Sequence, residues 1–134
     1  MKIEGGCLCG QVRYTAEAEP IFTACCHCKN CQKQSGTAFS VVVGLPEAAL
    51  QIDGEMKTYE DTADSGGVVE RKFCPKCGSA ILSSVPARPG MVILKAGSLD
   101  DTSWLDPKVH VWTESAMPFT YIPEGVMAFP KNAG

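Results

Sequence analysis

All eight cysteines of this 134-residue chain fall in three short stretches. The first is CLC, which starts at Cys7, the second is CCHCKNC, which starts at Cys25, and the third is CPKC, which starts at Cys74. Thiolate sulfur is a preferred protein ligand of zinc, and cysteine clusters in a reducing compartment are more often metal sites than disulfides. The cysteine spacing therefore predicts zinc binding.

The first and third stretches each offer two thiols from a tight turn. Their four cysteines are Cys7, Cys9, Cys74 and Cys77. Four sulfurs complete the ligand set of a tetrahedral structural zinc site. Gly78, directly after the last of them, can adopt the positive φ that turns backbone N–H groups toward sulfur. Because metal binding by such a site is coupled to folding, we expect a structural role.

The middle stretch has more thiols than half a site can use. Cys26 and Cys28 share one face of an extended segment, and Cys31 follows at the C-x-x-C spacing. Three sulfurs with a fourth position open are the arrangement of a catalytic zinc, where water or substrate takes the open place. Cys25 lies on the opposite face and is expected to be a buried free thiol.

His27, inside the same stretch, has three interpretations. As a fourth ligand it would close the site, although alternation places its side chain away from the neighbouring cysteines. It is otherwise a partly exposed side chain, or one that orients a ligand through a hydrogen bond. The third interpretation is a proton shuttle beside the metal.

A basic and polar segment follows the same cluster. Lys29 and Lys33 flank it and are candidates for binding an anionic thiol cofactor. Ser35, Gly36 and Thr37 offer hydroxyl and backbone donors in the adjoining loop. The alternative for both lysines is an ordinary solvated surface, because exposed charges usually act weakly.

Weaker candidates lie in the last third of the chain. His110 alternates with valines on an expected strand, which favours a surface or rim histidine. Trp104, Trp112 and Phe119 could wall a pocket, although aromatic residues in a small β domain more often belong to its core. The polar loop 97–107 could cover a metal or serve as a plain connection.

The elements that must position these residues are mostly strands. Short runs of β-branched and aromatic residues alternate with Gly, Pro and Asp, which is the pattern of an antiparallel β protein with little helix. The expected strands are residues 11–17, 21–25, 38–44, 56–61, 68–73, 79–85, 91–96 and 109–113. Turn residues at 64–67 and 86–90 predict two hairpins. Short helical turns are expected at 30–34 and after Pro46.

Size and composition limit the remaining choices. A length of 134 residues suits one domain, residues 1–134, and 45% hydrophobic with 20% charged residues is typical of a soluble globular chain. A formal charge of −3 offers no basic field, so we expect no nucleic-acid or membrane partner. The N-terminus does not read as a signal peptide, and we expect a cytoplasmic protein whose oligomeric state the sequence leaves open.

Four blocks of the sequence resemble the glutathione-dependent formaldehyde-activating enzyme family, whose named activity is that of S-hydroxymethylglutathione synthase. They are, in order, GGCLCGQVRY, CHCKNCQKQSGTAF, RKFCPKCGSAI and HVWTESAMPF, and the resemblance covers nearly the whole chain. It implies a mainly β fold of the β-tent type with two zinc sites. The structural ligands it implies are Cys7, Cys9, Cys74 and Cys77, and the catalytic ligands are Cys26, Cys28 and Cys31.

The resemblance also implies a reaction, the joining of formaldehyde and glutathione or the reverse carbon–sulfur cleavage. A thiol that binds zinc is deprotonated at neutral pH, and the thiolate is the species that attacks a carbonyl carbon. We therefore expect a zinc-dependent carbon–sulfur lyase with two zinc ions and a small thiol such as glutathione as co-substrate. The alternative is a non-catalytic, zinc-stabilised protein-binding module. A redox sensor is disfavoured, because adjacent cysteines such as Cys25 and Cys26 bridge only with strain.

Overall fold

The computed structural model describes residues 1–63 and 65–133, and this part of the chain is mainly β. Its strands are β1 (Lys2–Gly6), β2 (Arg13–Glu17), β3 (Phe22–Cys26), β4 (Ser40–Pro46), β5 (Leu50–Asp53), β6 (Lys57–Thr62), β7 (Val68–Phe73), β8 (Ala80–Ser84), β9 (Met91–Lys95), β10 (Val109–Val111) and β11 (Met127–Ala128). Its helices are α1 (Lys29–Ser35) and the short 3-10 turns η1 (Glu47–Ala49), η2 (Ala96–Ser98) and η3 (Thr113–Ser115). The expected mainly β class is confirmed.

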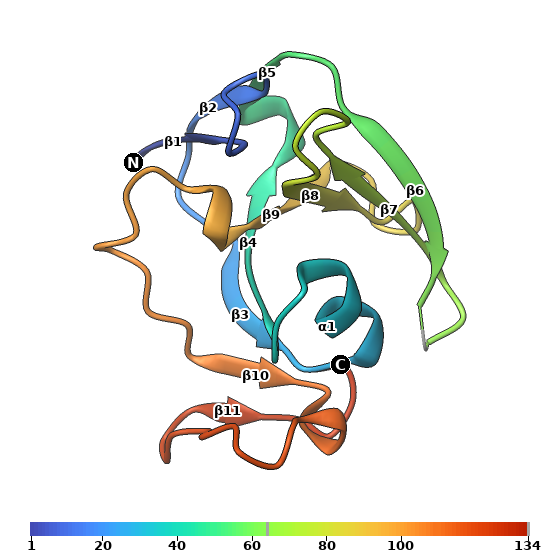
Figure 1. Ribbon diagram of the computed structural model, residues 1–134. Coiled ribbons are helices and arrows are strands. Elements are labelled where there is room, and N and C mark those ends of the chain that lie inside the picture. Colours follow the sequence, from blue (N-terminus) through green and yellow to red (C-terminus); the bar gives the residue numbers. More distant parts are fainter. Residues whose placement is uncertain (64, 134) are drawn as a thin grey trace.

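The strands form two sheets. The small sheet has the order β1-β2-β5, and the large sheet has the order β11-β10-β3-β4-β9-β8-β7-β6. Most neighbours are antiparallel, as expected, but β10 runs parallel to both β3 and β11. Parallel neighbours need a long connection, and here the whole middle of the chain separates β3 from β10. In Figure 1 the large sheet curls around α1.

The expected strands all occur, with ends that shift by at most a few residues. Both expected hairpins form, β6 with β7 and β8 with β9, although the first turn includes residue 64, which lies outside the described residues. Three strands were not expected, namely β1, β5 and β11. In the described residues no helix reaches the length and hydrophobicity that a membrane-spanning helix needs.

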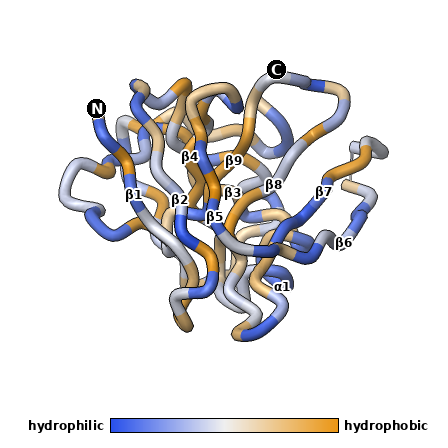
Figure 2. Tube along the Cα trace, turned by 90° about the horizontal axis from the view of Figure 1, so that it is seen from above, coloured by the Kyte–Doolittle hydropathy of each residue, from blue (hydrophilic) through white to orange (hydrophobic). Residues whose placement is uncertain are grey.

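The core lies between the small sheet and the central strands of the large one. Ile3 on β1 and Tyr14 and Ala16 on β2 are buried and alternate with more exposed neighbours, as on a sheet with one covered face. They pack with buried residues of β4, β8 and β9, which are Val43, Leu45, Ile81, Leu82, Val92 and Leu94. Figure 2 shows hydrophobic segments along these central strands and a more hydrophilic β7. Cys7 and Cys74 belong to the same core cluster.

The helix α1 is tied to distant parts of the chain. Asn30 donates a hydrogen bond to Asp61 on β6 at 3.0 Å, and the buried Gln32 donates to the Ser115 carbonyl at 2.9 Å. The helix ends at Gly36, whose φ of 69° is left-handed and suits glycine. These bonds fix α1 between the two ends of the large sheet.

Candidate functional site

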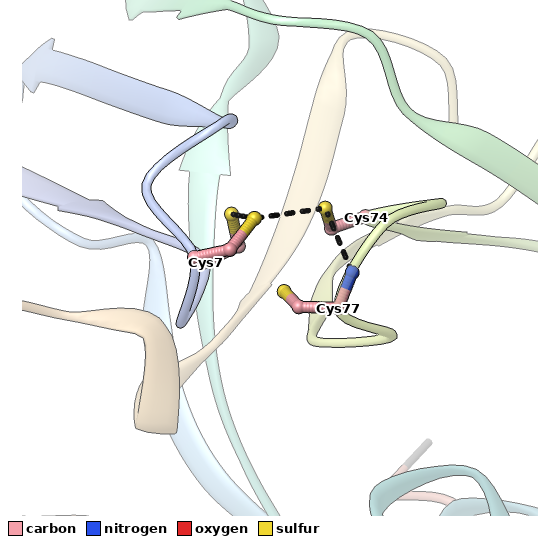
Figure 3. A group of neighbouring side chains, drawn as sticks. Cys7, Cys74 and Cys77 are labelled. Carbon is pink, nitrogen blue, oxygen red and sulfur yellow. Dashed lines mark hydrogen bonds between the residues drawn. The ribbon is translucent and has the colours of Figure 1, made fainter.

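Four sulfur atoms meet where two loops face each other (Figure 3). The loop between β1 and β2 carries Cys7 and Cys9, and the loop between β7 and β8 carries Cys74 and Cys77. All four sulfurs lie within 4.8 Å of one another. The Cys7 and Cys9 sulfurs are 3.6 Å apart, and those of Cys9 and Cys74 are 3.8 Å apart. The fold therefore brings together the four cysteines that the sequence predicts.

These distances suit a bound metal and exclude disulfides. A disulfide holds its sulfurs about 2.05 Å apart, and all eight cysteines are free. A tetrahedral zinc with Zn–S bonds of about 2.3 Å separates its sulfur ligands by roughly 3.8 Å. The donor set and its spacing thus fit zinc.

Backbone and hydroxyl groups contact three of the four sulfurs, and the pKa values of Cys7 and Cys77 are lowered whereas that of Cys9 is raised to about 11. The Val12 N–H donates to Cys7 Sγ at 3.2 Å, and the Cys77 N–H donates to Cys74 Sγ at 3.5 Å. The Ser79 hydroxyl lies 3.2 Å from Cys77 Sγ, and this hydroxyl, with backbone N–H groups, lowers the pKa of Cys77 to about 5. Such donors stabilise negative charge on sulfur, which a metal ligand needs.

A second sulfur cluster forms where β3 leads into α1. Cys26 ends β3, Cys28 is the N-cap of α1, and Cys31 lies in its first turn. Their sulfurs lie within 4.8 Å of one another, and Cys28 Sγ accepts a hydrogen bond from the Cys31 N–H at 3.3 Å. Cys28 is buried and the other two are partly exposed. Cys25 is a buried free thiol outside this group, and burial raises its pKa.

A buried lysine that the sequence analysis did not select lies beside this cluster. Lys95, at the end of β9, is 6% exposed. Its Nζ donates to the hydroxyl of Ser40 at 2.7 Å and to that of Ser35 at 3.3 Å. The available signal was a lysine that directly follows the apolar run Met91 to Leu94, within a strand with buried residues.

A buried arginine adds a second positive charge. Arg71 on β7 forms an ion pair with Asp61, with Nε 2.8 Å from Oδ2 and side-chain exposures of 6% and 17%. Hydrogen bonds from the two neighbouring thiols, together with the charges of Lys95 and Arg71, hold the pKa of Cys31 well below its ordinary value. Lys95 and Arg71 thus favour the thiolate form of Cys31, the one thiol of the three whose pKa is lowered.

His27 lies within the cysteine run but outside the group of sulfurs. It is fully buried, so the interpretation as a partly exposed side chain is wrong. Its Nε2 lies 2.9 Å from His110 Nδ1. His110 is also buried, and the expectation of a surface or rim histidine is wrong, because β10 lies inside the sheet between β3 and β11. His27 therefore faces another histidine and not the cysteines.

The residues expected to bind a thiol cofactor lie on α1 and just after it. Lys29 and Lys33 are exposed, and neither forms an ion pair within residues 1–63 and 65–133. The hydroxyl of Ser35 accepts the lysine hydrogen bond described above. The backbone N–H groups of Gly36 and Thr37 both donate to one carbonyl of the helix end, at 2.9 and 3.2 Å. Those two donors are thus already used.

The remaining candidates have different surroundings. Trp104 packs against the core, whereas Phe119 is 76% exposed. The indole of Trp112 donates to Asn132. The loop 97–107 runs along the edge strand β1, where Leu99 pairs with Gly5, and Asp100 forms an ion pair with an arginine of β2. It is a connection packed on the N-terminal hairpin.

Comparison with known proteins supplies the family. A family model described as glutathione-dependent formaldehyde-activating enzyme matches residues 2–115. A protein of Halomonas elongata is 29% identical over 121 residues, which cover 86% of this chain and 77% of that protein. A protein of Talaromyces marneffei is 23% identical over 123 residues, 90% of this chain and 65% of that protein. Both names describe candidate glutathione-dependent formaldehyde-activating enzymes, and the chain spans about two thirds of the fungal relative.

A solved structure agrees with the fold. The crystal structure of a protein from Rhodobacter sphaeroides aligns with a TM-score of 0.58 at 18% identity, over 72% of this chain and 87% of that chain. At this identity the likeness concerns the fold. The family match extends over most of the chain and contains both cysteine clusters. The chain therefore belongs to the glutathione-dependent formaldehyde-activating enzyme family.

Proposed function

We propose that the chain is a zinc-dependent carbon–sulfur lyase that acts on adducts of a small thiol, such as glutathione, with an aldehyde such as formaldehyde. The observation that carries this proposal is the cluster of three sulfurs at Cys26, Cys28 and Cys31, separate from a complete group of four. Four thiolates fill a tetrahedral zinc, whereas three leave one position for a substrate.

Each cluster has its own role in this proposal. A structural zinc would be held by Cys7, Cys9, Cys74 and Cys77, and a catalytic zinc by Cys26, Cys28 and Cys31. When bound, the second zinc supplies a Lewis acid that favours the thiolate form of a substrate thiol. The partial exposure of two of the three cysteines leaves this cluster open to a ligand from solvent.

The chemistry needs little beyond positioning. The adduct carries a sulfur and a hydroxyl oxygen on one carbon. In the cleavage the hydroxyl proton passes to solvent water, the oxygen electron pair forms the aldehyde C=O bond, and the C–S bond breaks to leave a thiolate. The chain contributes by holding the sulfur beside its three cysteines, and pre-positioning of this kind lowers the barrier.

Glutathione carries two carboxylates, and these need basic or polar partners. Lys29 and Lys33 lie on the helix that carries Cys31, and we propose them as partners of the carboxylates. Ser35, Gly36 and Thr37 stand at the end of the same helix, and because the backbone donors of Gly36 and Thr37 are used, we propose the hydroxyls of Ser35 and Thr37 as the donors of this thiol-binding segment.

The metal part of the proposal is tested by elemental analysis. Protein purified without oxygen and supplied with zinc is expected to hold two zinc ions, of which the four-thiolate ion survives a chelator longer. At most one equivalent under these conditions would count against the second site and favour the protein-binding module. Formaldehyde release from S-hydroxymethylglutathione by the two-zinc protein then tests the lyase activity.

The thiol part is tested by calorimetry with the zinc-loaded protein. Replacing both Lys29 and Lys33 with Gln is expected to weaken glutathione binding, and high salt should do the same. A thiol without carboxylates, 2-mercaptoethanol, should be indifferent to both changes. The matched control replaces Lys57 and Lys108, two exposed lysines outside the helix. If glutathione does not bind while 2-mercaptoethanol does, glutathione is not the co-substrate.

We place this activity in the cytoplasm. Eight free cysteines, several of them close enough to oxidise to disulfides, suit a reducing compartment. The protein is expected to retain its metal in glutathione at cytosolic redox poise and to lose it after oxidation. Both results would support this location.

A further inference from the structure

Lys95 is a buried ammonium whose partners are all neutral. The described residues form four ion pairs, and none of them includes Lys95. A buried charge without an opposite charge nearby is strongly destabilising. A negative charge close to Lys95 would therefore stabilise its charged form.

The three-cysteine cluster is the source of that charge. Burial and, to a smaller extent, the charge of Arg71 lower the pKa of Lys95, whereas the charge of Cys31 and then those of the other two cysteines raise it. Arg71 lies near the same cluster, but its charge is already opposed by Asp61 at 2.8 Å. Arg71 also interacts with Cys31, but Lys95 is the cation beside the cluster that has no carboxylate partner among the described residues.

The hydrogen bonds of Lys95 tie it to α1, which carries Cys31, and to β4, the neighbour of the strand that carries Cys26. Ser40, its partner at 2.7 Å, lies directly opposite Cys26 in the pairing of β3 with β4. Ser35, its partner at 3.3 Å, lies on the helix that carries Cys31. An ammonium has three N–H donors, and these two hydroxyls use two of them. One donor is left for an acceptor in the site.

The net charge of a metal bound to the cluster determines how Lys95 would affect the choice of ligand. A divalent metal with three thiolates carries one net negative charge, and a fourth thiolate would raise it to two. In a partly buried site a second negative charge on the metal complex is unfavourable, so the fourth position prefers a neutral ligand unless a nearby cation offsets the charge. The fixed ammonium of Lys95 supplies that cation and makes an anionic sulfur ligand the preferred one, without contacting the rest of the substrate.

We propose that Lys95 makes the three-cysteine site selective for anionic sulfur ligands, because its ammonium is the counter-ion of the substrate thiolate. This inference deepens the proposed function and rests on it, since it requires a metal at Cys26, Cys28 and Cys31. Lys95 acts here on the ligand as a specificity-determining residue.

The test uses the full chain loaded with Co²⁺, whose absorption reports thiolate binding. It compares 2-mercaptoethanol, which lacks carboxylates, with imidazole, which binds as a neutral ligand. In Lys95→Met the dissociation constant of 2-mercaptoethanol is expected to rise roughly 10-fold to 100-fold, the range for losing a hydrogen bond to a charged group. Imidazole should bind with unchanged affinity. Lys95→Arg should retain thiol binding, and Lys57→Met is the control on an exposed lysine.

The outcomes separate this inference from the function on which it rests. Unchanged 2-mercaptoethanol affinity in Lys95→Met would overturn the inference, and so would equal weakening of both ligands, which indicates a structural role. Wild-type protein that binds only one Co²⁺ would reject the proposed function, and the inference with it. If Lys95→Met is insoluble, Lys95→Gln keeps a donor for the two serines without the charge, and the same selective loss is expected.

Discussion

His27 Nε2 lies 2.9 Å from His110 Nδ1, and both rings are buried. The rings are stacked at a centroid distance of 5.2 Å and an angle of 21°. In such a contact one imidazole donates and the other accepts, which favours two neutral rings over a charged pair. The pair connects the segment between Cys26 and Cys28 to the strand β10 near the end of the chain.

The histidine pair predicts a loss of stability in mild acid. Burial lowers the pKa of His27, as does the neighbouring His110, and burial lowers the pKa of His110. In the unfolded chain both rings bind protons below about pH 6.5, so the unfolded state binds more protons there and the free energy of unfolding falls as pH drops below that value. NMR titration of the ring signals checks this. Ring signals that titrate at or above about pH 6.5 would contradict it.

The two sulfur clusters should respond differently to loss of one ligand. Cys77→Ser removes a ligand whose binding energy is folding energy, and we expect the free energy of unfolding to fall by about 4 kcal/mol or more, since metal loss is among the few single changes of that size. Cys28→Ser should fold and hold one zinc instead of two. Thermal melts with zinc analysis measure both. Equal insolubility of the two variants would refute the division into structural and catalytic sites.

The buried ion pair between Asp61 and Arg71 should be costly to break. Asp61→Asn leaves the arginine buried without its counter-charge, and the expected loss is about 3 to 5 kcal/mol of unfolding free energy. The matched control is Asp106→Asn, which breaks a pair with Lys108 whose side chains are both 71% exposed. That change should cost at most about 1 kcal/mol. Urea denaturation of the zinc-loaded proteins compares them, and similar losses would contradict the burial argument.

Gly5 is required for space and not for an unusual backbone angle. A Cβ at this position would overlap the Ser98 carbonyl oxygen and the Tyr14 hydroxyl. Gly5→Ala is expected to destabilise the protein by about 1 to 3 kcal/mol, the usual cost of overpacking. A Cβ built at Gly97 would meet no atom within 4 Å, so Gly97→Ala is the control and should be nearly neutral. Guanidinium denaturation distinguishes them, and a neutral Gly5→Ala would show that β1 can move away from β2.

The sequence predicted best those features whose parts lie close together along the chain. The two cysteine pairs and the three-cysteine cluster follow from short spacings within turns, and the hairpins follow from turn residues between apolar runs. The joining of the two distant pairs was predicted because a tetrahedral zinc needs four ligands. His110 was misjudged because its burial depends on β10 lying beside β3, a pairing between distant segments that alternation does not show. Lys95 ends an apolar run, and nothing local shows that Ser35 and Ser40 enclose its ammonium. Strand β1, with the sequence KIEGG, lacks a β-branched run and forms through its pairing with β2.

The four-cysteine group joins residues that are made at different times. Cys9 and Cys74, whose sulfurs lie 3.8 Å apart, are 65 positions apart in the chain. A ribosome that adds about 5 to 20 residues per second needs roughly 3 to 13 s to bridge that gap. During this interval the first two thiols have no partners for a complete metal site and are open to peroxide and to competing metals. We therefore expect the fraction of correctly metallated protein to depend partly on how much reductant and free zinc the nascent chain meets during translation.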